Sequence, residues 1–211
     1  MTIRAAARSL LIVAVLAASA ASAWGQAAFV QGGYGVELRR FSAEEGDRVF
    51  DADSGHFTIG GGGFLTPHIS AGLELELGEA STSTRSATLT FASGPGTVTT
   101  SYTMRRRGVS ALIGIHSPAA HTVRVGAYAG LSFSSVRREI ASNAPPIVIA
   151  QPPETSVFTD RTAGPVVGVD AAFRIAPHIA IVGMLRGQAL TLTGDLRGFT
   201  VRPSAAARIT F

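Results

Sequence analysis

The C-terminal segment Arg197–Phe211 reads RGFTVRPSAAARITF and alternates between two kinds of side chain. In an extended strand, one face would carry the apolar set Phe199, Val201, Pro203, Ala205, Ala207, Ile209 and Phe211. The other face would carry the mostly polar set Thr200, Arg202, Ser204, Ala206, Arg208 and Thr210. A strand of a membrane barrel turns its apolar face outward to lipid and its polar face inward. The segment therefore predicts a strand embedded in lipid.

Three more segments repeat this alternation, namely Ile69–Gly78, Val123–Phe133 and Val167–Ile175. Their charged residues all fall on the face opposite the apolar side chains; these are Glu74, Glu76, Arg124, Asp170 and Arg174. Chance placement would put several charges on the apolar face. The pattern predicts an all-β fold whose strands each keep one uncharged face.

The composition agrees with a membrane location. Hydrophobic residues make up 46% of the chain and charged residues only 15%, against about 25% charged residues in soluble domains. After residue 23 no long apolar run remains, and only helices and closed barrels satisfy their backbone groups in lipid. A closed barrel is therefore expected. The chain has no cysteine, so hydrogen-bonded strand ladders rather than disulfides must hold it together.

The turns predict the number of strands. Thr66–His68 and Ala176–His178 are near-copies of one Pro-containing turn, and Ser117–His121 is a looser copy. Proline cannot donate to a strand ladder, so each copy marks strand ends. The other connections, at about 40–54, 92–96 and 141–157, are longer, and the tight 193–195 completes the set. Short turns that alternate with mostly long loops are typical of outer-membrane barrels, and they predict eight antiparallel transmembrane strands.

The N-terminus has the form of a secretory signal. Arg4 and Arg8 precede an uncharged stretch from Leu10 to Ala23, which ends in the small residues that a signal peptidase requires. A transmembrane anchor is the alternative, but this stretch has 14 residues, whereas a spanning helix needs about 20. We predict that residues 1–23 are a cleavable signal peptide and that residues 24–211 form one barrel domain.

These features resemble the outer-membrane β-barrel domain family, in particular its small eight-stranded members such as OmpX and the membrane domain of OmpA. The resemblance rests on the signal, the alternation, the turn asymmetry and the terminal Arg208-Ile209-Thr210-Phe211. It implies a bacterial outer-membrane location, contact with outer-membrane lipid, and Phe211 as a signal read by the barrel-assembly machinery. The chain is expected to act as a monomer.

Charged residues on the non-apolar faces are expected in the lumen. The acids are Glu37, Glu74, Glu76 and Asp170, and the bases are Arg124, Arg174, Arg186, Arg202 and Arg208. One interpretation is a path for ions, and the other is a packed polar plug. Eight strands enclose a space that side chains just fill, which favours the plug. At least one Glu–Arg pair is then expected among Glu74, Glu76, Arg186 and Arg202.

No catalytic, metal or cofactor site is expected. His116 and His121 flank one short turn, but no Ser–His–acid set is placed on one face by the alternation. The five histidines lack the paired spacing of metal ligands. The 18 basic and 14 acidic residues nearly balance, and no basic stripe carries interleaved aromatic residues. Nucleic acid is therefore not an expected partner.

Two features point to partners outside the barrel. Arg105 and Arg107 are expected to face outward near the outer end of a strand, where they would bind lipopolysaccharide phosphates or extend their side chains to the interface. The hairpin 86–102 is too long for the bilayer, so it is expected to project as a two-stranded ribbon. Its free edges would pair with a strand of an extracellular protein, or it is an inert loop.

The sequence thus favours a non-enzymatic outer-membrane surface protein that is structural or presents its loops to a partner. A narrow porin-like channel for ions or small solutes is the first alternative. A lipid-modifying outer-membrane enzyme is the second.

Overall fold

The computed structural model describes residues 27–42, 48–91, 94–118, 122–143, 154–192 and 196–211. The predicted signal peptide and its cleavage site, as well as His121, lie outside these residues. The described chain forms nine strands: β1 (Ala28–Ser42), β2 (Arg48–Thr66), β3 (Ile69–Gly78), β4 (Ser81–Phe91), β5 (Gly94–His116), β6 (Val123–Asn143), β7 (Glu154–Ala176), β8 (Ile179–Leu192) and β9 (Leu196–Thr210). No helix long and apolar enough to cross a membrane occurs among them.

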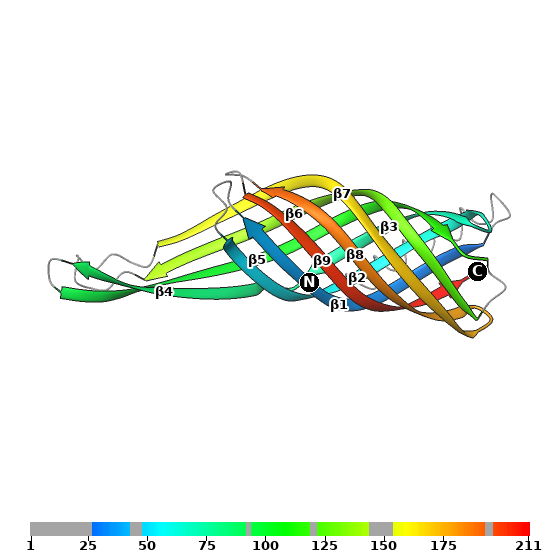
Figure 1. Cartoon of the computed structure of the whole chain (residues 1–211), viewed down its shortest axis with the longest axis horizontal. Helices are drawn as coiled ribbons and strands as arrows, with labels where there is room; N and C mark the ends of the chain where they lie inside the picture. Colours follow the sequence, from blue (N-terminus) through cyan, green and yellow to red (C-terminus); the bar gives the residue numbers. More distant parts are fainter. Residues whose placement is uncertain (1–26, 43–47, 92–93, 119–121, 144–153, 193–195) are drawn as a thin grey trace.

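All strand pairings are antiparallel, and the two ends of the strand order pair with each other. The order runs β3-β2-β1-β9-β8-β7-β6-β5, and β3 also pairs with β5. Eight strands therefore form a closed ring, and β4 continues β3 along the same neighbour β5. The predicted all-β antiparallel fold is confirmed. The ninth strand is β4, which lies beyond the ring because β5 is long enough to pair first with β4 and then with β3 (Figure 1).

The side chains alternate across the ring as the sequence predicts. On β6, Leu131 and Phe133 are 56% and 60% exposed, whereas Ser132 and Ser134 are buried. Apolar side chains also face outward along the other strands that cross the belt. The interior is mixed: most of its buried side chains are polar or charged, but Ala172, Val182, Met184 and Ala206 form an apolar cluster there. The outer surface is suited to lipid.

The short turns lie at one end, where the C-terminus also lies (Figure 1). In the β2–β3 turn, the backbone N–H groups of His68 and Ile69 donate to the Thr66 hydroxyl at 3.2 and 3.0 Å. His68 also contacts the carbonyl of His116, and His178 contacts the carbonyl of Thr210 in the same way. Each turn histidine thus ties its turn to the end of a neighbouring strand.

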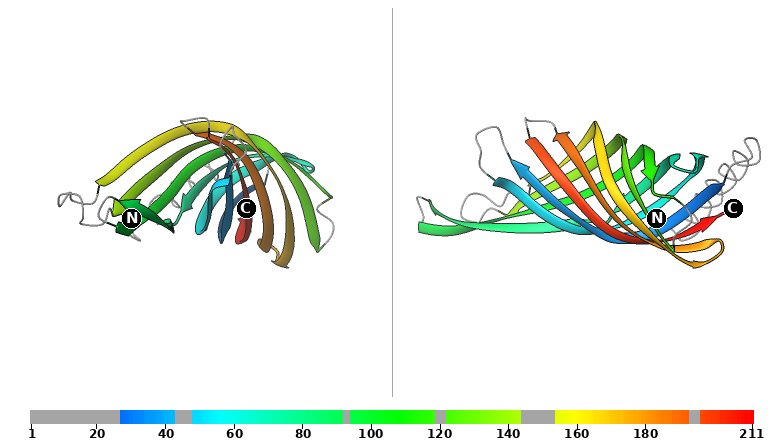
Figure 2. Two further views of the ribbon diagram at one scale, coloured as in Figure 1. Left: turned by 60° about the vertical axis from the view of Figure 1, so that its left-hand side comes forward. Right: turned by 45° about the vertical axis from the view of Figure 1, so that its right-hand side comes forward.

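The other end projects as a broad sheet. The β4–β5 hairpin pairs from Ser81–Met104 to its tip, β6 follows β5 as far as Thr99, and β7 follows β6 as far as Glu154. Figures 1 and 2 show β4 and β5 running well beyond the ring. The prediction of a two-stranded ribbon over 86–102 is wrong in part: four strands project, and only the tip has two. The reason is that β6 and β7 have 21 and 23 residues, far more than the roughly 9–11 that span a bilayer.

Candidate functional site

Most of the predicted lumen charges are buried inside the ring. These are Glu37, Glu74, Glu76, Asp170, Arg186, Arg202 and Arg208. Arg124 and Arg174 differ: Arg124 is half-buried and Arg174 is exposed. Both lie at the short-turn end, where they line a cavity of about 530 Å³. There Arg124 donates to the Pro67 carbonyl and covers the Phe64 ring at 4.1 Å. Arg124 and Arg174 thus lie at the open end of the lumen, apart from the buried charges.

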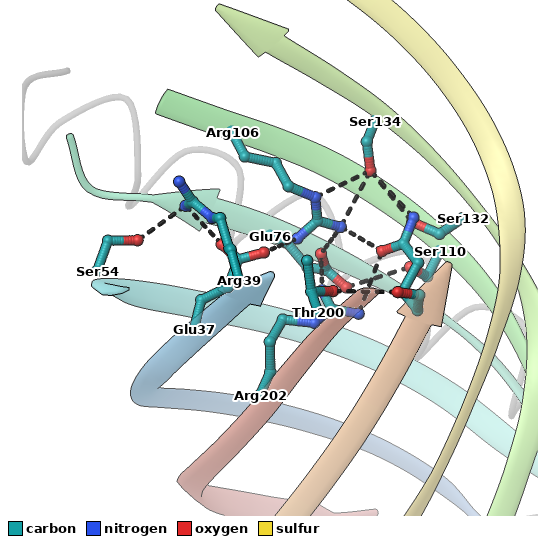
Figure 3. Close-up of polar contacts among 11 residues, drawn as sticks. Glu37, Arg39, Ser54, Glu76, Arg106, Ser110, Ser132, Ser134, Thr200 and Arg202 are labelled. Atoms are coloured by element: carbon teal, nitrogen blue, oxygen red, sulfur yellow. Dashed lines mark hydrogen bonds and ion pairs between the residues drawn. The ribbon is translucent and has the colours of Figure 1, made fainter. Parts of the chain in front are cut away.

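Arg106 is the centre of the buried network, and sequence analysis did not place it there. From β5 it donates to Glu37 Oε1 on β1 at 3.0 Å and to Glu76 Oε2 on β3 at 2.6 Å. It also donates to Ser134 on β6 and to the Gln188 amide oxygen on β8. Figure 3 shows Glu37, Glu76 and Ser134 around the Arg106 guanidinium. One arginine thus links strands on opposite sides of the lumen.

Glu76 is the second hub of the network. Its carboxylate accepts from Arg106, forms an ion pair with Arg202 of β9, and accepts from Ser110 at 3.2 Å. Glu74 lies two residues before Glu76 on β3, nearer the short turns. Its Oε2 atom is 3.8 Å from Nη2 of Arg186. The expected Glu–Arg pairs among these residues therefore form, and all the paired groups are at most 3% exposed.

Arg39 was also missed by sequence analysis. It is fully buried and donates from Nη2 to Glu37 at 2.7 Å and to Ser54 at 2.8 Å. The signal was present, because Arg39 is two residues from Glu37 and so shares its face. Likewise Arg106 shares a face with Ser110 and not with its neighbours Arg105 and Arg107. Strict alternation of inward and outward residues would have placed both Arg39 and Arg106 in the lumen.

A second cluster lies nearer the short turns. Asp170 Oδ2 accepts from the Tyr128 hydroxyl at 2.8 Å and from Arg208 Nη2 at 2.6 Å. Arg208 also donates twice to Gln31 Oε1, at 2.9 and 2.8 Å, and Gln31 donates to Glu74. A chain of polar contacts therefore runs from Asp170 through Arg208 and Gln31 to the Glu74–Arg186 pair.

The structure places a serine, a histidine and an acid on one face, contrary to the sequence prediction. Ser70 Oγ lies 2.7 Å from His116 Nε2. His116 Nδ1 and Asp170 Oδ1 have no hydrogen-bond partner, and a Cβ on Gly126 would lie 2.6 Å from both atoms. Ser70 is only 1% exposed, and the cavity beside it measures about 20 Å³, which is room for about one water. The cavity at the hydroxyl is therefore small, whereas a larger cavity of about 910 Å³ borders His116 and Asp170.

The remaining predicted residues lie at the surface or the rim. Arg105 and Arg107 are exposed on the outer face of β5. Phe211 is 58% exposed, and its backbone N–H donates to the Ala28 carbonyl at 2.8 Å. Within the described parts of the chain, no three histidine, aspartate or glutamate side chains gather as metal ligands would. The described part of the lumen is thus dominated by ion pairs.

Comparison with known proteins identifies the family. The sequence profile of the family described as outer membrane protein beta-barrel domain matches residues 10–201. Among solved structures, neisserial surface protein A is 14% identical, with 88% of this chain and 99% of that chain covered and a TM-score of 0.50. The attachment invasion locus protein Ail of Yersinia pestis is 10% identical, with 87% and 99% covered and a TM-score of 0.50. A search of curated proteins finds no significant match.

The two structural likenesses concern the fold alone, because both identities are low. The profile covers most of the chain and agrees with the closed ring, the outward apolar faces and the asymmetric ends. The chain belongs to the outer membrane protein β-barrel domain family, whose place in the cell is the outer membrane.

Proposed function

We propose that this chain is a non-enzymatic surface protein of the bacterial outer membrane, in which a sealed barrel holds a projecting sheet that binds a strand of a partner protein. The observation that carries the proposal is the exposed edge of β4. Over Ser81–Phe91 this strand pairs with β5 alone among the described strands. The hydrogen-bonding groups of its other side are therefore available to an added strand.

The projecting sheet has a second open edge. The β7–β8 ladder begins at Val166, so within the part of the chain that the structure describes Glu154–Arg161 pairs with β6 and with no second strand. Natural sheets usually protect such edges with charged residues, lysine above all, or with proline. The β4 strand contains neither lysine nor proline, and Arg85 is its single charged residue. The sparse protection of the β4 edge supports a role in strand addition over an inert loop.

The exposed face of the ribbon is uniformly hydroxylated. Thr82 contacts Thr103 at 3.0 Å, and the pairs Thr84–Ser101 and Ser86–Thr99 repeat the contact. Such cross-strand pairs each contribute about 0.2–1 kcal/mol. They hold the ribbon extended without an apolar core, which keeps the free edge of β4 straight.

Shortening the ribbon should abolish partner binding. Thr84 and Ser101 are cross-strand partners, so residues 84–101 can be replaced by Asn-Gly, which closes a tight hairpin after Ser83. Proteoliposomes carrying this variant should bind an epithelial cell layer or immobilised basement-membrane extract at least about tenfold less than wild type. The control variant, Thr82→Ala with Thr103→Ala, keeps the edge and should bind normally. Equal binding by the shortened and full-length chains would contradict the proposal.

The barrel itself should be closed to ions. Arg106, Glu76 and Arg202 meet across the lumen, and an eight-stranded barrel is just wide enough for side chains to fill it. Wild-type protein in planar bilayers should therefore give no stepwise conductance. The measurement uses about 1 M KCl, at which even a channel of low conductance carries a measurable current. A wide porin in the same bilayer is the positive control. Reproducible steps from wild-type protein would favour the channel instead.

A further inference from the structure

On three neighbouring strands, the outward-facing side chains change from apolar to polar or charged above the same row of cross-strand partners. Val109 of β5, Phe133 of β6 and Ala163 of β7 are cross-strand partners. All three are exposed, with Val109 at 45% and Phe133 at 60%. They are the last members of the apolar series that runs up these strands from the short turns. This row therefore marks the upper edge of the lipid belt on β5–β7.

Arginines occupy the outward positions just above this edge. Two residues further along each strand, the partners are Arg107, Ser135 and Arg161. In the next outward row, Arg105 of β5 lies directly opposite Arg137 of β6. All four arginines are exposed. The outward side chains thus pass from apolar to cationic within one step on β5 and β7 and within two steps on β6.

The spacing of these arginines is unfavourable unless an anion lies between them. Directly opposed residues have Cβ atoms about 4.5–5.5 Å apart, and like charges in such a pair are destabilising. Arg107 and Arg161 are each diagonal to Arg137, at about 7–8 Å. Glu139 shares the outer face, but no ion pair within the described parts of the chain joins it to Arg105 or Arg137.

We propose that Arg105, Arg107, Arg137 and Arg161 form a binding site for the phosphate groups of an outer-leaflet lipid. A guanidinium binds phosphate oxygens in a bidentate manner, and one phosphate between two opposed arginines removes their repulsion. The apolar row below would contact the acyl chains of the same molecule. This combination selects an acylated, phosphorylated saccharide, the chemistry of lipopolysaccharide, over free phosphate.

The site goes beyond the two arginines that the sequence suggested, because ladder register brings Arg137 and Arg161 to them from other strands. It is also separate from the proposed partner-binding edge of β4. Arg106 lies between Arg105 and Arg107 in sequence but faces the lumen, where it holds Glu37 and Glu76. It is therefore not part of the site.

Lipid binding can be measured by native mass spectrometry of the full chain in detergent with lipid A that carries two phosphates. Wild type should retain this lipid, and Arg105→Gln with Arg137→Gln should weaken retention by at least about tenfold. The matched control is Arg85→Gln with Arg174→Gln, which removes two exposed arginines away from the site and should retain lipid as wild type does. Heat-modifiable gel migration shows that each variant is folded, and Arg137→Gln alone provides a milder variant.

Two further measurements distinguish a phosphorylated lipid from free phosphate as the ligand. Lipid A without phosphates should bind weakly, and millimolar inorganic phosphate should not displace the phosphorylated lipid. The proposal is overturned if the Arg105/Arg137 variant retains lipid as wild type does, or if removal of the phosphates leaves binding unchanged. It is also overturned if inorganic phosphate competes as well as the phosphorylated lipid, because the site would then bind a free ion.

Discussion

Replacing Glu76 with alanine is expected to lower the free energy of unfolding by about 3–5 kcal/mol. The carboxylate is 2% exposed and pairs with both Arg106 and Arg202. Its removal leaves Arg106 with Glu37 as its carboxylate partner, and leaves Arg202 without an ion pair among the described residues, with Gln188 as a shared neutral acceptor. Uncompensated buried charge is among the largest penalties that one substitution can cause.

Glu79→Ala is the matched control for this effect. Glu79 is exposed and is only three residues further along the chain, so its loss should change stability by no more than about 0.5 kcal/mol. Urea unfolding of the refolded proteins in detergent, followed by gel migration, gives both values. Glu76→Gln should fall between them, because the amide keeps an acceptor but loses the charge. If Glu76→Ala and Glu79→Ala have equal stabilities, the network does not hold the barrel together.

The period-two pattern was sufficient to predict which face would meet lipid in the four segments where the alternation is regular. It relies on the strong preference of lipid for apolar groups, which a single strand expresses without its neighbours. The Pro-containing turns gave the ends of the ring strands for the same local reason. Leu131 and Phe133 outside, with Ser132 and Ser134 inside, follow directly from the alternation.

Contacts inside the lumen could not be predicted in this way. The pattern says that Glu76 and Arg202 face inward, but ring closure and ladder register decide that they touch across the barrel. The same holds for Ser70 and His116, which the β3–β5 register brings together from positions 46 residues apart. Arg124 and Arg174 face inward by parity, yet they lie at the open end of the ring, where both line a cavity.

The projecting sheet shows a different limit. Thr-rich segments on both sides of Gly94-Pro95-Gly96 made the hairpin visible in the sequence. The extension of β6 and β7 was not visible, because Arg137, Arg138 and Glu139 are consecutive charges that mask the alternation. In the structure Arg138 faces Asp160 at 2.8 Å while Arg137 faces outward. A strand above the membrane has water on both faces, so both faces can carry charged residues.

The second large effect is expected at Asp170. Asp170→Ala should destabilise the barrel by about 3–5 kcal/mol, because it leaves Arg208 with Gln31 alone and removes the acceptor of the Tyr128 hydroxyl. Asp53→Ala is the matched control. Asp53 forms a pair with Arg40 in which both side chains are more than half exposed, and such pairs contribute at most about 1 kcal/mol.

A double-mutant cycle separates charge pairing from lost packing at this cluster. If Asp170 acts by neutralising Arg208, then Asp170→Ala combined with Arg208→Ala should cost less than the sum of the single changes, by about 0.5–3 kcal/mol. Tyr128→Phe should cost only about 1 kcal/mol, since it removes one hydrogen bond and keeps the ring that covers Arg186 at 4.6 Å. Thermal unfolding in the same detergent measures all four proteins. Additive effects of Asp170→Ala and Arg208→Ala would show that the 2.6 Å contact between these side chains carries no coupling, and the barrel interior would then be stabilised by packing rather than by paired charge.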